Sequence, residues 1–403
     1  MNAGTRAQAF AEGADLADPW LYTSGDRFRW WGEMALAQAV PWTGPGTTPG
    51  GFWSVFSHRL GNQVLGPTAP FTSECGMMLG FDAEHPDHAG GRMIVVTDGA
   101  RHRVLRKLIG PFLSRLRAEE MAGFVLREAH DLLDRLAGGS AVQVARDIGP
   151  RLPAAVVCEV LGIPESDREW LIALTRDAFG EAGAGGNQMS PGEAHTEILM
   201  YFQELVDFRR EHPGNDLPSA LLADSSMSVE DTVMNCDNVL VGGNETTRHA
   251  ITGAFHAVAV TQGLLPALVA DGTRIAAAVE ETVRWTSPAM HVLRVAEQDT
   301  EVGGARIRKG DAVAVWLASC NRDPTVFEDP GEFRLDRANG GHLGFGHGPH
   351  HCLGAAMTRI ELQALYRAMG ERISGVALVD EPLWLSSNII QGYRGLAVDL
   401  TWN

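Results

Sequence analysis

Phe345-Gly346-His347-Gly348-Pro349-His350-His351-Cys352-Leu353-Gly354 is the most informative segment of this chain. Its glycines and its proline predict a tight, constrained loop, and the amphipathic pattern that follows predicts a helix directly after it. Cys352 should therefore lie at or beside a helix N-terminus, where backbone N–H groups and the helix dipole favour a thiolate. Because Gly354 lacks a side chain, a flat group could approach the backbone closely there.

Three kinds of site are compatible with this loop: a haem iron bound by Cys352, a zinc ion, and a structural cysteine beside a turn. Zinc is considered because several histidines crowd around the cysteine, namely His342, His347, His350 and His351. Zinc sites usually need a second pair of ligands at a suitable spacing, and no such CxxC or HxxxH pair occurs elsewhere. The loop by itself favours haem but leaves the other two readings open.

Composition and termini favour one soluble unit. The chain has 403 residues, of which 45% are hydrophobic, and no linker, repeat or low-complexity tract divides it. We expect a disordered N-terminus over residues 1–17 and a single domain over residues 18–403. The N-terminus does not resemble a secretory signal, no run has the ~18 apolar residues of a membrane span, and a cytoplasmic monomer is expected. Five scattered cysteines argue against a disulfide framework.

The net charge of −17 makes nonspecific nucleic-acid binding unlikely, but the charge is unevenly spread. One segment carries six cations without an acid between them: Arg101, Arg103, Arg106, Lys107, Arg115 and Arg117. A basic face on an acidic protein indicates an acidic partner or a buried anionic group. The alternative is an ordinary solvated helix face.

Hydrophobic periodicity predicts a mainly α fold with a minor β portion in one compact unit. The predicted helices cover Arg101–Phe112, Ala118–Leu136, Leu152–Leu161, Asp167–Phe179, Glu193–Glu211, Ser228–Val260, Thr273–Trp285 and Ala355–Ile373. The predicted strands cover Gly51–Ser57, Arg92–Val96 and a series after Pro288 that turns at Gly303-Gly304. Ser228 with Asp231 gives a capping-box-like start to the longest helix.

The cysteine loop resembles that of the cytochromes P450, whose pattern is Phe-x-x-Gly-x-x-x-Cys-x-Gly. Phe345, Gly348, Cys352 and Gly354 match it. The resemblance implies the P450 fold with haem b (iron protoporphyrin IX) as cofactor. It makes Cys352 the metal ligand, whose thiolate pushes electron density onto iron. It also gives His350 a haem propionate as its partner.

Further segments agree with this family in the family's order. Glu281 and Arg284 match its Glu-x-x-Arg pair, and Arg337 matches the second arginine of that structural cluster. His102 and Arg106, four residues apart on one helix face, resemble its propionate-binding pair, although Asp98-Gly99-Ala100 replaces the usual Pro-rich lead-in. Arg294 matches a further propionate-binding position.

The segment Gly242-Gly243-Asn244-Glu245-Thr246 resembles the family's oxygen-binding groove. Adjacent glycines cost a helix roughly 1 kcal/mol each relative to alanine, so Gly243 is expected to make room for the cofactor. Gly242 replaces a more usual alanine. By resemblance, Glu245 and Thr246 are the catalytic pair that delivers protons during dioxygen activation.

These features imply a monooxygenase that uses O2 to hydroxylate or epoxidise an apolar small molecule. A polyketide, terpenoid or peptide-derived intermediate of secondary metabolism is expected, free or bound to an acyl or peptidyl carrier protein. Its pocket is expected to be lined by Met77, Met78, Phe81, Leu240, Ala289, His291, Val292, Ile389 and Ile390, with His291 as a polar group that orients the substrate.

The chain has no flavin or iron–sulfur signature, so the resemblance implies a ferredoxin and a ferredoxin reductase as electron donors. Arg101, Arg103, Lys107 and Arg115 are expected to form the unpaired docking face. Two alternatives stay open: a P450-type oxidase that performs coupling or another non-hydroxylating oxidation, and a noncatalytic recruitment module.

Overall fold

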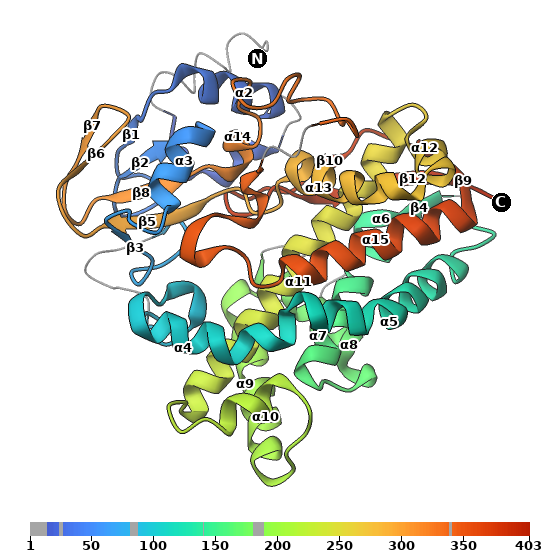
Figure 1. Cartoon of the computed structure of the whole chain (residues 1–403), viewed down its shortest axis with the longest axis horizontal. Coiled ribbons are helices and arrows are strands. Elements are labelled where there is room, and N and C mark those ends of the chain that lie inside the picture. Colours follow the sequence, from blue (N-terminus) through green and yellow to red (C-terminus); the bar gives the residue numbers. More distant parts are fainter. Residues whose placement is uncertain (1–13, 24–26, 81–87, 140, 180–188, 338–340) are drawn as a thin grey trace.

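The helix α11 (Val229–Val260) runs through the middle of the molecule, and other helices pack around it (Figure 1). In this computed structural model the described residues are 14–23, 27–80, 88–139, 141–179, 189–337 and 341–403. The hydroxyl of Ser228 caps α11 by accepting a hydrogen bond from the N–H of Asp231, as the sequence predicts. Leu240, Ile251 and Phe255 are fully buried on this helix, which makes it a core element.

Helices dominate the chain, and their apolar faces meet in one large hydrophobic cluster that includes α11. The other α-helices are α2 (Arg27–Ala37), α3 (His58–Leu65), α4 (Gly99–Ile109), α5 (Arg115–Asp134), α6 (Val144–Asp147), α7 (Arg151–Leu161), α8 (Arg168–Ala178), α9 (Pro191–Glu211), α10 (Leu217–Leu222), α12 (Leu264–Ala270), α13 (Ile275–Thr286), α14 (Leu317–Cys320) and α15 (Ala355–Arg372). Helix α15 packs against α5, α11 and α13. The helix that follows the cysteine loop is therefore fixed by the main core.

A five-stranded sheet forms the β portion and lies to one side of α11 (Figure 1). Its order is β1 (Trp42–Thr43), β2 (Phe52–Val55), β8 (Ala312–Val315), β5 (Val292–Ala296) and β3 (Phe71–Thr72). Only the β2–β8 pair of this sheet is parallel. The smaller sheets are β4 (Ala141–Gln143) with β12 (Ala397–Trp402) and β9 (Ile373–Leu378), β6 (Thr300–Val302) with β7 (Ala305–Ile307), and β10 (Leu383–Trp384) with β11 (Tyr393–Gly395).

The structure confirms the predicted fold class and each predicted helix, with ends that shift by a few residues. The strand predicted at Arg92–Val96 is wrong, because Ile94–Val96 is a 3₁₀ helix. The side chain of Asn235 explains the difference: it accepts from the N–H of Ile94 at 3.0 Å and donates to the carbonyl of Arg92 at 3.0 Å. These bonds take backbone groups that a neighbouring strand would otherwise pair.

Among the described residues, no single helix has the length and apolar character needed to cross a membrane. Taken together, α11 and α12 are long and apolar enough for a membrane span, but the pair is sharply bent, and this likeness rests on length and composition alone.

Candidate functional site

The cysteine loop is held in a fixed shape by its own backbone and by α4. The N–H of Cys352 donates to the carbonyl of Phe345 at 2.8 Å. Arg106 on α4 donates to the carbonyls of Pro349 at 3.0 Å and His351 at 2.8 Å. Gly348 has a φ of +70°, and a Cβ there would collide with the carbonyl oxygen of Leu65, so glycine is required at this turn.

The surroundings of Cys352 combine accessible surface with close neighbouring atoms. Its side chain keeps accessible surface, yet burial raises the pKa of its thiol. The N–H groups of Gly354 and Ala355 and the nearby Arg106 oppose this shift only in part. The N–H groups at the helix start therefore act in the predicted direction, toward the thiolate, but burial outweighs them. A bound metal cation would supply the charge that a buried thiolate needs.

A cluster of basic side chains lies beside the loop. The rings of His102 and His350 are 4.4 Å apart, and Asp98 accepts from His350 Nε2 at 2.7 Å. Burial would raise the pKa of Asp98, but hydrogen bonds from His350, Thr72 and the N–H of Ser73 hold that pKa well below its usual range. Burial, with the charges of His350 and Arg106, lowers the pKa of His102 to about 4.

Arg294 completes this cluster as a buried cation that feels the charge of Asp98 but forms no ion pair within the described part of the chain. It is 7% exposed, its NH1 donates to the carbonyl of Leu293 at 2.7 Å, and it forms no ion pair with a described carboxylate. Burial lowers its pKa to about 10. An unpaired buried guanidinium is costly unless an anion joins it. Together with the accessible Cys352 thiol, these donors fit a flat anionic group that carries a metal, as haem with its propionates does.

On α11, the paired glycines serve different purposes. A Cβ on Gly242 would meet open space, whereas one on Gly243 would lie 2.6 Å from Val157 Cγ2 of α7. Gly243 therefore permits close packing of α11 on α7, which differs from the room for a cofactor expected at this position, and Gly242 is the exposed glycine of the pair. One turn later, the Thr246 hydroxyl donates to the Gly242 carbonyl at 3.0 Å.

Glu245 points away from this surface into a buried ion pair. Its carboxylate lies 2.8 Å from Arg248 and 3.3 Å from His249, and all three side chains are about 1% exposed. Burial would raise the pKa of Glu245, but Arg248 and His249 lower it. The carboxylate is therefore held charged on the helix turn that carries Thr246.

The structure brings Glu281, Arg284 and Arg337 together beneath the cysteine loop. Arg284 binds both oxygens of Glu281 at 2.7 Å, and Arg337 Nε donates to Glu281 Oε1 at 2.9 Å. Arg284 also donates to the carbonyl of Asn321 at 2.9 Å, and the side chain of Asn321 accepts from the N–H of Leu343 at 2.6 Å. This chain of bonds connects α13 to the start of the loop.

The segments predicted to line the substrate pocket converge. The N–H of Leu293 donates to the carbonyl of Met77, and the N–H of Met290 donates to that of Ile389, each at 2.8 Å. The lining candidates that keep accessible surface are Met77, Met78, Ala289, Val292 and Ile389. Leu240 and Ile390 are buried at 1% and 3% exposure, with Leu240 in the main core, so both present little surface to a ligand. Phe81 lies outside the described residues.

His291 does not present a free polar group, which corrects the expectation that it orients the substrate. Its Nε2 accepts from the N–H of Leu79 at 3.0 Å, and its Nδ1 lies 2.8 Å from the carbonyl of Asn388. Burial lowers its pKa to about 4.

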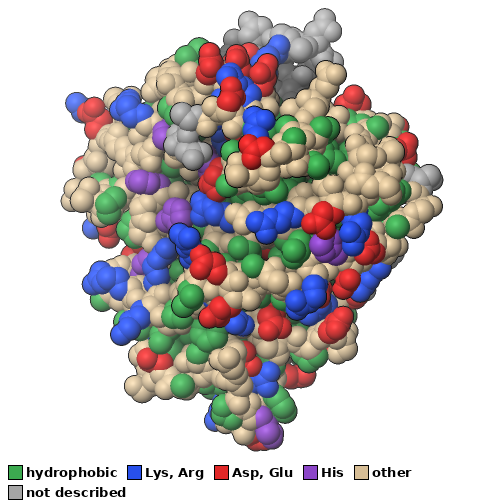
Figure 2. All heavy atoms as spheres, turned by 45° about the vertical axis from the view of Figure 1, so that its right-hand side comes forward, with side chains coloured by type: hydrophobic (Ala, Val, Ile, Leu, Met, Phe, Trp, Pro, Cys, Tyr) green, Lys and Arg blue, Asp and Glu red, His purple; other side chains and the backbone are tan. Residues whose placement is uncertain are grey.

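The predicted docking face is smaller than expected. Arg101 pairs with Asp231 at 3.0 Å and Arg115 with Glu119 at 2.8 Å, so these two cations are not unpaired. Arg103 and Lys107 are exposed on α4 and form no ion pair within the described part of the chain. Figure 2 shows one face of the molecule, on which basic and acidic side chains are interspersed.

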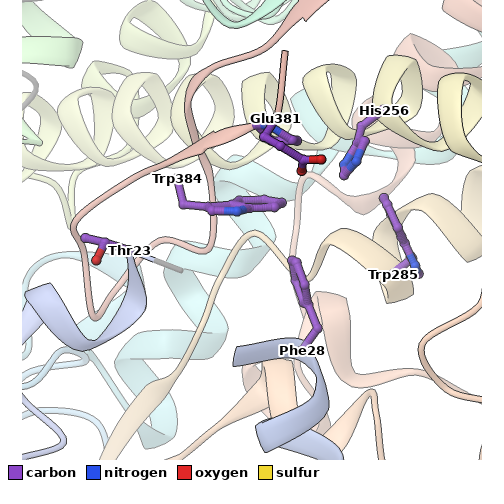
Figure 3. Close-up of a pocket in the computed structure, with 7 residues that line it drawn as sticks. Thr23, Phe28, His256, Trp285, Glu381 and Trp384 are labelled. Atoms are coloured by element: carbon purple, nitrogen blue, oxygen red, sulfur yellow. The ribbon is translucent and has the colours of Figure 1, made fainter. Parts of the chain in front are cut away.

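Sequence reasoning missed Arg359 and a surface pocket. The Arg359 guanidinium lies 4.6 Å from the centre of the Phe345 ring and binds Glu280 at 2.6 Å. No short motif marked this arginine. The pocket has a volume of about 410 Å³, shares no residue with the cysteine loop, and is lined by Thr23, Phe28, His256, Trp285, Glu381, Pro382 and Trp384 (Figure 3). Among the described residues, no three His, Cys, Asp or Glu side chains are grouped to hold a metal, so the zinc reading gains no support.

Known proteins resemble this chain over nearly its whole length. The family model described as Cytochrome P450 matches residues 274–369. Cytochrome P450 NovI of Streptomyces niveus is 33% identical over 396 residues, which cover 97% of each chain. The crystal structure of P450 OxyD, which is involved in the biosynthesis of vancomycin-type antibiotics, matches with a TM-score of 0.93 and 52% identity over 97% of this chain and 100% of that chain.

A third similar structure is P450BioI in complex with an acyl carrier protein that bears hexadec-9Z-enoic acid. It matches with a TM-score of 0.81 and 25% identity over 93% of this chain and 97% of that chain. The cysteine loop, the buried cations beside it and these similarities agree: this chain belongs to the cytochrome P450 family, the family of haem monooxygenases.

Proposed function

We propose that this chain hydroxylates or epoxidises an apolar intermediate of secondary metabolism, presented on an acyl or peptidyl carrier protein. The observation that carries the chemistry is the accessible Cys352 thiol in a fixed loop near Arg294, a buried cation that forms no ion pair with a described carboxylate. The observation that carries the substrate class is the similarity to P450 OxyD, at 52% identity over 97% of this chain. The P450BioI complex with a loaded carrier protein supports the mode of presentation.

In this proposal, Cys352 is the metal ligand, and His102, His350 and Arg294 hold the propionates of haem b. Arg106 lies beside them, and each of its terminal nitrogens that binds a loop carbonyl keeps a second N–H for an anion. Phe345, Gly348 and Gly354 shape the loop around the cofactor. Bound haem supplies the activation of O2, with electrons delivered from outside the chain.

Glu245 and Thr246 handle protons in this scheme. Thr246 carries a hydroxyl that donates to the Gly242 carbonyl and can rotate to offer its proton to another acceptor. Glu245 is ionised in its ion pair with Arg248, so handing on a proton requires this carboxylate to turn out of the pair toward Thr246. Protons then enter from the side of α11.

Electrons come from a ferredoxin and its reductase in this proposal. Arg103 and Lys107 lie four residues apart on α4, so their side chains share one exposed helix face. Two unpaired cations on a protein of net charge −17 can attract an acidic partner locally. The same helix carries His102 and Arg106, which links this face to the cysteine loop.

The thiolate assignment is tested by the absorption spectrum of the reduced, CO-bound protein. We expect a strongly red-shifted Soret band in the wild-type protein and its loss in Cys352→Ser. Cys158→Ser is the matched control, because Cys158 is buried in the main core on α7. A colourless wild-type protein, or an unchanged band in Cys352→Ser, would overturn the proposal.

Carrier presentation is tested by difference spectroscopy with matched pairs of compounds. Each candidate acid is titrated free and as the thioester on a phosphopantetheine-loaded carrier protein. We expect a spectral shift with the carrier-bound form at concentrations where the free acid gives none. Equal affinity for both forms would remove the carrier protein from the proposal while leaving the oxidation chemistry in place.

A further inference from the structure

His291 joins two segments that carry residues predicted to line the substrate pocket. It lies just before β5, is 2% exposed, and touches the Met77–Leu79 segment through one ring nitrogen and the Asn388–Ile390 segment through the other. These segments are separated by more than 300 positions in the sequence. No repeat or motif marks the connection, and only the fold brings them together.

The two bonds fix the protonation state of the ring. A backbone N–H can only donate, so Nε2 must offer a lone pair to Leu79. A carbonyl can only accept, so Nδ1 must carry the proton that points to Asn388. His291 is therefore a neutral imidazole protonated on Nδ1, and each of its ring nitrogens is used.

The ring is also fixed from behind. Its centre lies 5.2 Å from that of Trp316, which is fully buried and donates to the Ser54 hydroxyl at 3.1 Å. Because Trp316 belongs to the aromatic core next to the five-stranded sheet, the imidazole cannot turn without disturbing that core. The ring therefore holds both segments at a fixed place relative to the sheet.

Backbone bonds hold the same segments at neighbouring positions. Leu293 binds Met77, Met290 binds Ile389, and Ala289 bridges to Ile390. Loss of the His291 bonds would leave these contacts in place, so the layer would persist. The parts set free would be the Leu79 N–H and the Asn388 carbonyl, next to the accessible side chains of Met78 and Ile389.

We propose that His291 is a positioning residue that sets substrate specificity by fixing the spacing between Leu79 and Asn388, the two positions of these segments that the three backbone bonds do not hold. It does so without touching the ligand. The inference rests on the proposed function only in taking these segments as walls of the substrate pocket. The affinity for a bulky ligand that contacts both walls should depend on this spacing, whereas the affinity for a small ligand at the iron should not.

The test compares two probes that bind haem iron, imidazole and the bulkier 4-phenylimidazole, by spectral titration of the haem-loaded protein. His291→Phe retains a ring against Trp316 and removes both hydrogen bonds. We expect the ratio of the dissociation constant of 4-phenylimidazole to that of imidazole to rise at least about fivefold, because even one of the two lost hydrogen bonds is worth this factor. Hydrogen exchange at the Leu79 amide should accelerate about tenfold.

Two conservative variants separate the two bonds. His291→Gln places a polar atom near the Nε2 position and His291→Asn places one near Nδ1, so each can restore one bond. We expect Gln to protect the Leu79 amide and Asn to leave it exposed, with both giving intermediate probe ratios. This graded rescue distinguishes positioning from a general loss of stability.

His256→Phe is the matched control, because His256 is also a buried histidine on a polar bond, 3.0 Å from the Tyr393 hydroxyl. Figure 3 shows it near Trp285 and Trp384, at the separate surface pocket. This variant should leave the probe ratio unchanged.

A probe ratio in His291→Phe that stays within about twofold of the wild type, or falls, overturns the proposal, as does an unchanged Leu79 amide. Failure of the proposed function looks different: the wild-type protein would lack the thiolate spectrum or would not bind imidazole.

Discussion

Removal of the Glu281 charge should cost far more stability than removal of an exposed carboxylate at the same helix spacing. Glu281 is 4% exposed and accepts from Arg284 through both oxygens, from Arg337, and from the N–H of Arg334 at 2.9 Å. Glu281→Gln keeps the shape but leaves two arginines without their anion. Breaking a buried pair in this way costs about 3–5 kcal/mol.

Asp207→Asn is the matched control, because Asp207 pairs with Arg210 at the same i, i+3 spacing with both side chains at least 50% exposed. Its loss should cost at most about 0.5 kcal/mol. Both variants are compared with the wild type in urea unfolding followed by circular dichroism, with a check that the slope of the transition is unchanged.

The same variant should also change the spectrum of the haem site. The bonds from Glu281 through Arg284 and Asn321 reach the N–H of Leu343 at the start of the cysteine loop. A smaller fraction of Glu281→Gln should therefore show the red-shifted reduced-CO band. If Glu281→Gln lowers the free energy of unfolding by less than about 1 kcal/mol, or by no more than Asp207→Asn does, the assignment of Glu281 as the anion that holds this cluster is refuted.

Three further predictions follow from the loop, the buried histidines and α4. Gly348→Ala should lose thiolate ligation in the reduced-CO spectrum, because its Cβ would collide with the Leu65 carbonyl. Gly272→Ala is the control and should keep the spectrum of the wild type, because a Cβ there meets no atom within 4 Å. Thiolate ligation retained in Gly348→Ala would contradict this prediction. Burial lowers the folded-state pKa of His102, His256 and His291 from 6.5 to about 4. Between pH 4 and pH 6.5 the unfolded chain then binds more protons than the folded one, so the free energy of unfolding is full above pH 6.5 and falls as the pH drops toward 4. In urea titrations at several pH values, His256→Gln should make this fall less steep. A fall as steep as that of the wild type would count against the prediction. The double variant Arg103→Glu, Lys107→Glu should slow reduction by a ferredoxin at low salt without changing the haem spectrum. Arg115→Glu is the control, because Arg115 already forms an ion pair with Glu119. Unchanged reduction rates in the double variant would remove α4 as the docking face.

Much of the fold was predictable because the helices are long and strongly periodic, and the cysteine loop was predictable because its glycines and proline are local signals. Gly243 shows where this reasoning stops: a glycine pair in a helix indicates a bare surface, but only the packing against Val157 shows which glycine faces which way. His291 shows the same limit, since its partners Leu79 and Asn388 are distant in sequence and bind it through backbone atoms, which no residue pattern reveals.

Arg115 and Arg101 were predicted as unpaired cations because no acid lies between them and their neighbours. Their partners lie outside the basic segment. Arg115 pairs with Glu119, one helix turn further along, and Arg101 pairs with Asp231 in the first turn of α11. A charge run therefore predicts a basic segment correctly but overstates its free charge.

The attachment of Arg106 to the cysteine loop has a consequence for how the outside of the molecule communicates with its centre. One rigid helix carries Arg103 and Lys107 at the surface and Arg106 against the carbonyls of Pro349 and His351. Any partner that binds this helix more tightly in one loop arrangement than in another is thermodynamically linked to the loop. Linkage is reciprocal, so the factor by which the partner changes cofactor affinity equals the factor by which the cofactor changes partner affinity.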